Sequence, residues 1–255
     1  MSSTNSRQQR LDAIKQEACR NYAHTWQLMV SAWQKDSREN VGWLMYAANY
    51  LFRTHNIRWA IDPFLLTSRI SAPPLDHPAA DLEKLNFILL THRHADHFDN
   101  ELIRLLKDFP ILWVVPLDMQ KTVIELGINK DAVITPQPGK PIDLCGIQVT
   151  PFSALHYHIE ANGVQYGVPE CGYFVETKEK RLLFPGDTRD YKVEKLPKFT
   201  QVDVAFAHTW LGKKCADMEI PPLVEEFAQF FCSIEPTQLV VTHLFEFKRP
   251  SIDQW

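Results

Sequence analysis

The stretch that decides the fold of this chain is Thr91-His92-Arg93-His94-Ala95-Asp96-His97-Phe98-Asp99. An apolar run at residues 87–90, free of Gly and Pro, comes directly before it and predicts a buried strand. In extended backbone, side chains two residues apart project to the same side, so His92 and His94 can reach one cation while Asp96 and His97 turn toward another. We therefore interpret the stretch as a metal site at a strand end. The alternative is a solvated polar loop.

The residues that follow this stretch predict a helix. Asp99 and Glu101 supply an acidic first turn, and residues 102–106 continue with helical apolar spacing. A further strand and helix are predicted at residues 111–115 and 117–126, and shorter β segments follow from residue 131 onward. Strands that alternate with helices indicate an α/β fold.

Several later strands of the predicted fold also lead to a histidine or an aspartate where they end. These strands cover residues 147–151, 181–184, 202–207 and 239–242, and they lead to His156, Asp187, His208 and His243. A sheet would gather such strand ends along one edge. Because these side chains complete a coordination set, they favour the metal site over the solvated loop.

Before the metal stretch, residues 48–53 and 57–62 predict a β-hairpin around a short polar break. His55 is then a turn residue, and His77 in the proline-rich loop that follows is assigned no chemistry. Asp62 ends the second strand, where its carboxylate could orient a ligand histidine. The same residue could equally be an ordinary turn aspartate.

The N-terminal part of the chain predicts a long helix. Apolar residues recur by threes and fours over residues 11–34, and a charged linker follows at residues 35–40. We therefore expect a helical extension at residues 1–40 and a main domain at residues 41–255. The apolar stripe is expected to pack on the main domain as ordinary core. The alternatives are a lid or a subunit contact, through which a homo-oligomer could form.

Composition indicates a globular protein. The 255 residues are 45% apolar, enough for a sizeable core, and the formal net charge is -4. Without a block of Lys or Arg, the chain lacks the charge pattern of a strong nucleic-acid binder. Five scattered cysteines predict free thiols in a reducing compartment. With neither a secretory h-region nor a long apolar run, we expect a cytoplasmic protein without a membrane span.

Taken together, these strand ends resemble the metallo-β-lactamase superfamily. Its His-x-His-x-Asp-His motif appears here at residues 92–97, and its later ligands match His156, Asp187 in Gly-Asp-Thr, and His243. Asp62 matches the family's structural aspartate. The resemblance covers roughly residues 41–255. It implies a four-layered αββα sandwich with its metals at one edge of the two sheets, preceded here by the N-terminal helical extension.

Carried over residue by residue, the resemblance implies two divalent metal ions. One would be held by His92, His94 and His156, the other by Asp96, His97 and His243, with Asp187 bridging both. Nitrogen and carboxylate ligands suit Zn²⁺ first, with Mn²⁺ or Fe as alternatives. Two such cations would leave a net positive site that attracts a small anionic substrate. Because metal binding lowers the pKa of water to about 7, we expect hydrolysis of a phosphodiester, lactone or ester.

Departures from other branches narrow the function. Asp187 in place of a cysteine argues against antibiotic hydrolysis, and His94 in place of a glutamate argues against the flavodiiron branch. The short segment after His243 argues against a glutathione thioesterase. The arrangement is most similar to lactonases and phosphodiesterases related to L-ascorbate 6-phosphate lactonase. Three alternatives stay open: a tRNase Z-like nuclease, a mononuclear iron persulfide dioxygenase, and a non-catalytic binding module stabilised by metal.

His208 and Asp96 are the candidate catalytic residues. His208 follows a strand at the predicted metal edge without being needed as a ligand, so it could protonate the leaving group. Its alternative is a satisfied core histidine, and His158 is a weaker candidate for the same role. Arg189, Lys213 and Lys214 could contact a substrate phosphate, although lone basic residues in loops are usually just solvated.

Overall fold

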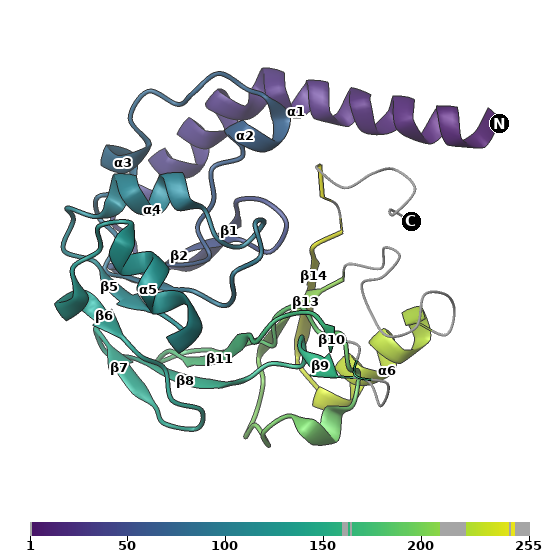
Figure 1. The fold of residues 1–255 in the computed structure, drawn as a ribbon. Helices are drawn as coiled ribbons and strands as arrows, with labels where there is room; N and C mark the ends of the chain where they lie inside the picture. The colour runs from purple at the N-terminus through teal and green to yellow at the C-terminus, as the bar shows by residue number, and fades with distance from the viewer. Residues whose placement is uncertain (1, 160–162, 164, 210–222, 245, 248–255) are drawn as a thin grey trace.

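A computed structural model of the chain describes residues 2–159, 163, 165–209, 223–244 and 246–247, and Figure 1 shows its layers. The first sheet has the order β1-β2-β3-β4-β5-β6, in which β1, β2 and β3 are antiparallel and β3 to β6 are parallel. Its strands are β1 (Asn40–Leu44), β2 (Tyr50–Thr54), β3 (Ile57–Ile61), β4 (Phe87–Leu89), β5 (Leu112–Val114) and β6 (Val133–Ile134).

The second sheet has the order β14-β13-β12-β11-β8-β7. Strands β12, β13 and β14 are parallel, whereas β11 is antiparallel to both β8 and β12. Its strands are β7 (Ile142–Leu144), β8 (Ile147–Ser153), β11 (Cys171–Glu176), β12 (Arg181–Phe184), β13 (Val204–His208) and β14 (Gln238–Thr242). A separate two-stranded sheet pairs β9 (His158–Ile159) with β10 (Gln165–Tyr166).

Helices cover the outer face of each sheet. The first sheet carries α1 (Ser2–Gln34), α2 (Thr67–Ile70), α3 (Pro78–Asp81), α4 (Asn100–Leu106) and α5 (Leu117–Glu125), with the 3-10 turn η1 (Lys130–Ala132). The second sheet carries α6 (Leu223–Ile234) and the 3-10 turn η2 (Val193–Lys195). Helix α4 begins where Asp99 accepts the backbone N–H groups of Glu101 and Leu102 at 3.0 Å each, a side-chain N-cap.

Alternating side chains build three apolar layers. In β2, Tyr50 and Phe52 face the second sheet while Leu51 faces the helices, and in β11 Tyr173 faces inward while Phe174 faces α6. One layer therefore lies between the sheets and one lies under each set of helices. This arrangement is the αββα sandwich that the family resemblance implies.

The second half of α1 belongs to the helical layer of the first sheet. Trp26 and Trp33 are buried in the same apolar cluster as Leu51 and Ile88, as expected for the apolar stripe. Buried Arg53 and Arg58 donate to carbonyl groups of the last turn, with Arg53 Nη1 2.6 Å from Ala32 O and Arg58 Nη2 2.7 Å from Gln34 O. The first half of the helix projects past the rest of the structure in Figure 1.

No helix in the described part of the chain combines the length and apolar character that a membrane crossing requires. The four cysteines that the structure describes, Cys19, Cys145, Cys171 and Cys232, are free thiols, as predicted. Cys215 lies outside the described residues.

Candidate metal centre

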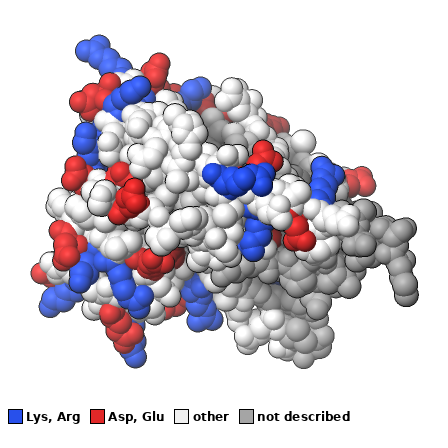
Figure 2. Space-filling view, turned by 90° about the horizontal axis from the view of Figure 1, so that it is seen from above, with Lys and Arg blue, Asp and Glu red and all other residues white. Residues whose placement is uncertain are grey.

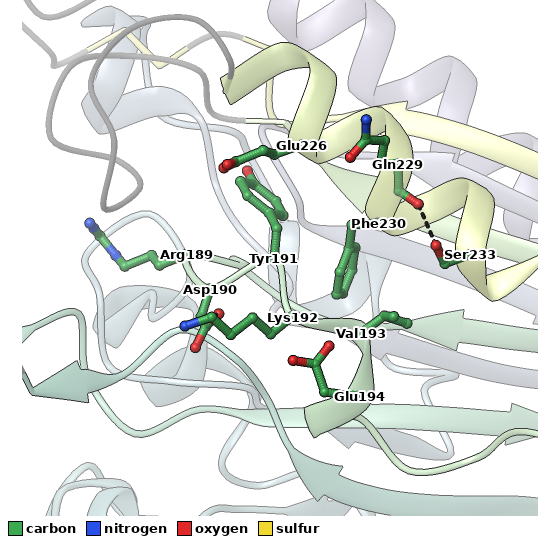
Figure 3. Close-up of a pocket in the computed structure, with 10 residues that line it drawn as sticks. All are labelled: Arg189, Asp190, Tyr191, Lys192, Val193, Glu194, Glu226, Gln229, Phe230 and Ser233. Atoms are coloured by element: carbon green, nitrogen blue, oxygen red, sulfur yellow. Dashed lines mark hydrogen bonds and ion pairs between the residues drawn. The ribbon is translucent and has the colours of Figure 1, made fainter.

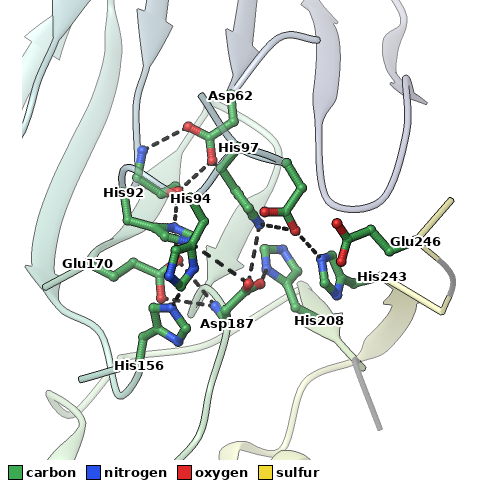
Figure 4. A network of polar contacts seen from close by, with 12 residues as sticks. Asp62, His92, His94, His97, His156, Glu170, Asp187, His208, His243 and Glu246 are labelled. Carbon is green, nitrogen blue, oxygen red and sulfur yellow. Dashed lines mark hydrogen bonds and ion pairs between the residues drawn. The ribbon is translucent and has the colours of Figure 1, made fainter. Parts of the chain in front are cut away.

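The side chains singled out in the sequence meet at one edge of the two sheets. Parallel strands β3 and β4 of the first sheet end there, delivering Asp62 and the stretch at residues 91–97. Parallel strands β12, β13 and β14 of the second sheet deliver Asp187, His208 and His243. Strand β8 runs in the same direction and leads to His156. Residues far apart in the sequence therefore surround one small volume (Figure 4).

Four side chains form a first cluster in which imidazole nitrogens face one another. His94 Nδ1 lies 3.0 Å from His92 Nε2 and 3.1 Å from His156 Nε2. Asp187 Oδ2 lies 3.9 Å from His92 Nε2. The ligand atoms of His92, His94, His156 and Asp187 all lie within 4.8 Å of one another.

Four side chains form a second cluster, and Asp187 belongs to both. Asp96 Oδ2 lies 3.1 Å from His243 Nε2 and 3.9 Å from His97 Nε2. The distance from His97 Nε2 to Asp187 Oδ2 is 3.3 Å. These ligand atoms also lie within 4.8 Å of one another. The two clusters contain the same two sets of residues that the family resemblance implies.

The spacing of these atoms fits a divalent metal. Two ligands that sit about 2.1 Å from a tetrahedral ion lie roughly 3.4 Å apart, close to the separations of 3.0 to 3.9 Å found in both clusters. Side chains of His92, His97 and His243 are almost fully buried, so water does not satisfy their nitrogens. Five imidazoles and two carboxylates converging in this way are suited to Zn²⁺, Mn²⁺ or Fe.

Asp62 holds His97 from behind, as the sequence proposed for this carboxylate. Its Oδ2 lies 2.8 Å from His97 Nδ1, and its Oδ1 accepts the backbone N–H of Thr91 at 2.8 Å. Thr91 also donates its hydroxyl to Asp62 Oδ2. Asp62 itself adopts a left-handed backbone conformation, with φ of 45°, immediately after β3. Because Nδ1 of His97 faces a carboxylate, Nε2 is the nitrogen turned toward the cluster.

The pKa of His97 is shifted in the opposite direction from the pKa values of the three histidines in the first cluster. Burial lowers the pKa of His92 and of His94, and it lowers the pKa of His156 to about 3, so all three are neutral at pH 7 as ligands must be. Burial also opposes charge on His97, but the carboxylates of Asp187 and Asp62 outweigh it and hold the pKa of His97 well above its usual value.

His208 lies at the predicted edge and contacts the shared aspartate. Its Nδ1 is 3.1 Å from Asp187 Oδ1, and the imidazole is buried. Its buried Nε2 has no hydrogen-bond partner among the described residues. The other oxygen of Asp187, Oδ2, faces both clusters. His208 is thus placed to hold the carboxylate of Asp187 in this orientation.

Glu170 is a buried member of the site that the sequence reasoning missed. Its Oε1 lies 3.0 Å from His92 Nδ1, and both of its oxygens accept the backbone N–H of Asp187. Burial raises the pKa of Glu170 to about 7. The residue precedes β11, whose direction is opposite to that of β8 and β12, so the start of β11 lies at the edge where those strands end. Because Glu170 comes before its strand, the end of an apolar run does not mark it in the sequence.

Arg189 connects the first cluster to an open pocket of about 400 Å³ (Figure 3). Its Nε donates to His156 Nδ1 at 3.2 Å. The aromatic rings of Tyr191 and Phe230 line this pocket, together with the positive charge of Lys192 and the negative charge of Glu226. Lys213 and Lys214 lie outside the described residues, and so does the side chain of His158.

A buried ion pair borders the second cluster, whereas the pocket described above borders the first. Arg69 Nη1 of α2 lies 3.0 Å from Glu246 Oε1, and the two side chains are 6% and 8% exposed. Arg69 Nη2 donates to the carbonyl of Ala95, which precedes Asp96. The pair therefore ties the segment after His243 to the loop that carries Asp96 and His97.

Comparison with known proteins supports this reading of the fold. Residues 58–244 match the family described as "Beta-lactamase superfamily domain". An isothiocyanate hydrolase from Delia radicum gut bacteria superposes with a TM-score of 0.61 and 17% identity, covering 82% of this chain and 86% of that one. Igni18, a metallo hydrolase from the archaeon Ignicoccus hospitalis, gives a TM-score of 0.57 and 18% identity, covering 82% and 84%.

The diiron β-hydroxylase CmlA from Streptomyces venezuelae is similar as well, with a TM-score of 0.55 and 16% identity. The similarity covers 84% of this chain and 49% of that one. At these identities the likeness establishes the fold alone. The activities named for these proteins include both hydrolysis and hydroxylation, so the chemistry of this chain has to be argued from its own site. The family match covers most of the chain and includes nearly every strand that leads to the two clusters. The chain belongs to the metallo-β-lactamase superfamily.

Proposed function

We propose that this protein is a dinuclear metal-dependent hydrolase of a small anionic phosphodiester, lactone or ester. The observation that carries the proposal is the position of Asp187. One of its oxygens, Oδ2, faces His92 of the first cluster at 3.9 Å and His97 of the second at 3.3 Å. A single carboxylate shared between two sets of buried ligands suits a pair of cations better than one.

Each protein group has a defined task in this proposal. When bound, the two cations would supply a nucleophilic hydroxide at neutral pH and polarise the scissile carbonyl or phosphoryl group. Asp96 would hold one cation as a ligand. His208 uses Nδ1 to hold Asp187, which leaves Nε2 to deliver a proton to the leaving group.

The charge of the site bears on the class of substrate. Asp96 and Asp187 alone would leave two divalent cations with a net positive charge. Asp62 and Glu170 lie directly behind His97 and His92 and bring the number of nearby carboxyl groups to four. If all four are ionised, they balance two divalent cations formally. The attraction for an anionic substrate is then assigned chiefly to Arg189, which borders both the first cluster and the pocket.

Zn²⁺ is the first choice of metal, with Mn²⁺ or Fe as alternatives. The proposal gives nucleic acid no role, because Lys and Arg are interspersed with Asp and Glu on the face shown in Figure 2. It assigns the enzyme to the cytoplasm, in keeping with the free thiols among the described cysteines. The projecting half of α1 is the segment through which two copies could associate.

Metal analysis tests the dinuclear proposal directly. Protein purified without chelator should carry two equivalents of transition metal, and it should hydrolyse at least one member of a chromogenic panel of phosphodiesters, lactones and esters. Fewer than one equivalent would overturn the proposal. Oxygen consumption by iron-loaded protein with a persulfide would favour the dioxygenase instead, and metal without any turnover would favour the binding module.

The role of His208 is tested by replacement with alanine. Assayed with metal in excess, so that both sites are filled, the His208→Ala variant should lose about 10²- to 10⁴-fold in kcat, the range expected of a general acid. The loss should shrink for substrates whose leaving group has a low pKa, because such groups need no proton. A variant that kept both metals and lost no rate would remove His208 from the mechanism.

A further inference from the structure

Glu170 is a carboxyl group buried behind the candidate metal centre. Its side chain has no exposed surface, and it lies between two residues of the first cluster. Oε1 is 3.0 Å from His92 Nδ1. The backbone N–H of Asp187 donates to both oxygens, at 3.2 Å to Oε1 and 3.0 Å to Oε2. One side chain therefore contacts the ring of one proposed ligand and the backbone of another.

The chain around Glu170 is fitted to this carboxyl group. Gly186, which precedes Asp187, has φ of 80°, and a Cβ at this position would lie 2.4 Å from the carboxyl carbon and from Oε2 of Glu170. Any side chain at residue 186 would thus displace Glu170 or the turn that carries Asp187. A buried carboxyl group destabilises a fold unless its hydrogen bonds are made, and here both of its contacts lead to the metal centre.

The neighbours of His92 indicate which of its nitrogens carries the proton. Thr91 donates its hydroxyl hydrogen to Asp62. The hydroxyl oxygen of Thr91, which lies 3.0 Å from His92 Nδ1, can therefore only accept a hydrogen bond from that nitrogen. Glu170 provides the second acceptor at the same nitrogen. Nδ1 therefore bears the hydrogen, and Nε2 is bare and directed at His94.

Glu170 and Asp62 serve the two clusters in parallel ways. Asp62 Oδ2 lies 2.8 Å from Nδ1 of His97 in the second cluster. In the first cluster, Glu170 Oε1 lies 3.0 Å from Nδ1 of His92. Each cluster thus has one histidine that is held by a buried carboxyl group from the opposite side of its ring. A histidine oriented in this way is a better ligand, because its tautomer and direction are fixed before the metal arrives.

We propose that Glu170 is a positioning residue for the metal in the cluster of His92, His94 and His156, and that it also holds the turn carrying Asp187. This inference rests on the proposed function in so far as these residues are ligands. The larger effect should fall on a different site in each case: loss of Glu170 should weaken chiefly the first metal, because His92 belongs to that cluster alone, whereas loss of Asp62 should weaken chiefly the second. Neither residue needs to touch the substrate.

The Glu170→Gln variant separates the two contacts. Glutamine keeps the size of the side chain and one carbonyl oxygen, which can accept the hydrogen on Nδ1 of His92. Its amide nitrogen then replaces Oε2, so two donors meet there and the 3.0 Å contact with the N–H of Asp187 is lost, which leaves only the 3.2 Å contact at Oε1. Glu170→Met removes both contacts, so metal affinity should fall in the order Glu, Gln, Met.

Metal affinity provides the test. Wild type, Glu170→Gln and Asp62→Asn are titrated with Zn²⁺ in competition with a chromogenic chelator. Wild type should bind two equivalents, and each variant should bind one of them about 10- to 100-fold more weakly. Asp203→Asn is the matched control, because Asp203 accepts the backbone N–H of Arg181 at 2.8 Å in the same sheet without contacting either cluster. Its affinities should equal those of wild type.

Combined variants assign the weakened site. Glu170→Gln added to His156→Ala should weaken zinc binding little further, because both changes act on the first cluster. Added to His243→Ala, it should leave no tight site. The inference would be overturned if the Glu170→Gln variant bound both equivalents of zinc as tightly as wild type. It would also be overturned if Glu170→Gln further weakened zinc binding by the His156→Ala variant but not by the His243→Ala variant.

Two further readouts keep the inference apart from folding and from the proposed function. If Glu170→Gln does not fold, nitrogen NMR of wild type at pH 8 still reports the tautomer of His92, and hydrogen on Nε2 in the metal-free protein would overturn the inference. If wild type binds a single equivalent, the dinuclear function fails. The inference then requires that Glu170→Gln weaken that one site by the same 10- to 100-fold.

Discussion

Arg189 donates its Nε–H to Nδ1 of His156 at 3.2 Å, while Nε2 of the same imidazole lies 3.1 Å from His94 Nδ1. A histidine that binds metal through Nε2 keeps its hydrogen on Nδ1. The N–H at Nε of Arg189 and the N–H at Nδ1 of His156 would then face each other, and two donors cannot form a hydrogen bond. Metal loading should therefore turn the guanidinium away from His156, toward the pocket that Arg189 also lines.

We expect Arg189 to bind the anionic group of the substrate in the metal-loaded protein. Arg189→Gln should weaken competitive inhibition by inorganic phosphate by about 10- to 100-fold, which corresponds to the loss of one charge-assisted hydrogen bond of roughly 1.5–3 kcal/mol. Inhibition constants measured against a chromogenic substrate provide the readout. Arg181→Gln, which changes a half-exposed arginine on β12, is the control and should leave inhibition unchanged. An unchanged constant in Arg189→Gln would contradict this role.

Metal binding should release protons, because His97 carries one in the metal-free protein. The carboxylates of Asp187 and Asp62 hold the pKa of His97 above its usual value despite burial, and Nε2 has to be bare before it can bind metal. Zn²⁺ affinity should therefore rise with pH as folded His97 loses its proton, and it should level off above the raised pKa of His97. Calorimetry in buffers of different ionisation enthalpy counts the protons released.

The same proton stabilises the metal-free fold. Since the pKa of His97 is higher in the folded chain than in the unfolded one, its contribution is complete below about pH 6.5 and is lost as pH rises through the folded value. Urea unfolding of the metal-free protein should show this decline, and a His97→Gln variant should show a flatter one. A stability that rises over this range would contradict the assignment.

Sequence patterns predicted which side chains the structure brings together where those residues follow strands that all run in one direction. His156, Asp187, His208 and His243 each follow an apolar run, so the strand end marks them without knowledge of the pairing. Glu170 could not be found in this way, because it precedes a strand. Only the antiparallel placement of β11 between β8 and β12 brings it to the edge, and strand order is a tertiary property.

Strand β1 was missed for a related reason. Its residues alternate between exposed and half-buried positions, and Gly42 breaks the apolar pattern that would mark a strand. The register explains the glycine: a Cβ at Gly42 would lie 2.5 Å from the ring of Phe52, the residue paired with it on β2. Such a close approach follows from pairing across strands and leaves no local signal.

The second half of α1 should contribute to the stability of the whole domain. Trp33 is fully buried, and its Nε1 donates to Phe52 O of β2 at 2.8 Å. Trp33→Ala should lower the free energy of unfolding by about 3–5 kcal/mol, the cost of a large cavity. Ile14→Ala, on the projecting half and 39% exposed, should change it by no more than about 0.5 kcal/mol. Urea denaturation followed by circular dichroism measures both, and equal midpoints for the two variants would show that α1 is not part of the core.

The ion pair of Arg69 and Glu246 should stabilise both the fold and the second cluster. Both partners are nearly buried, so Arg69→Met should lower the free energy of unfolding by about 3–5 kcal/mol, since it removes the guanidinium that faces a buried carboxylate at 3.0 Å. Adding Glu246→Met should recover part of this loss, because two apolar side chains can replace a buried pair. Lys121→Met is the control, because its 3.8 Å pair with Glu125 is exposed and contributes at most about 0.5 kcal/mol.

Arg69 also holds the carbonyl of Ala95, so its loss should reach the neighbouring Asp96. Arg69→Met and the double variant should therefore both bind the second equivalent of Zn²⁺ more weakly, even where the double variant regains stability. Zinc titration alongside urea unfolding separates the two effects. Affinity that recovers together with stability would mean that the pair acts on the fold alone, whereas affinity that stays low would show that the guanidinium itself holds the loop of Asp96 in place.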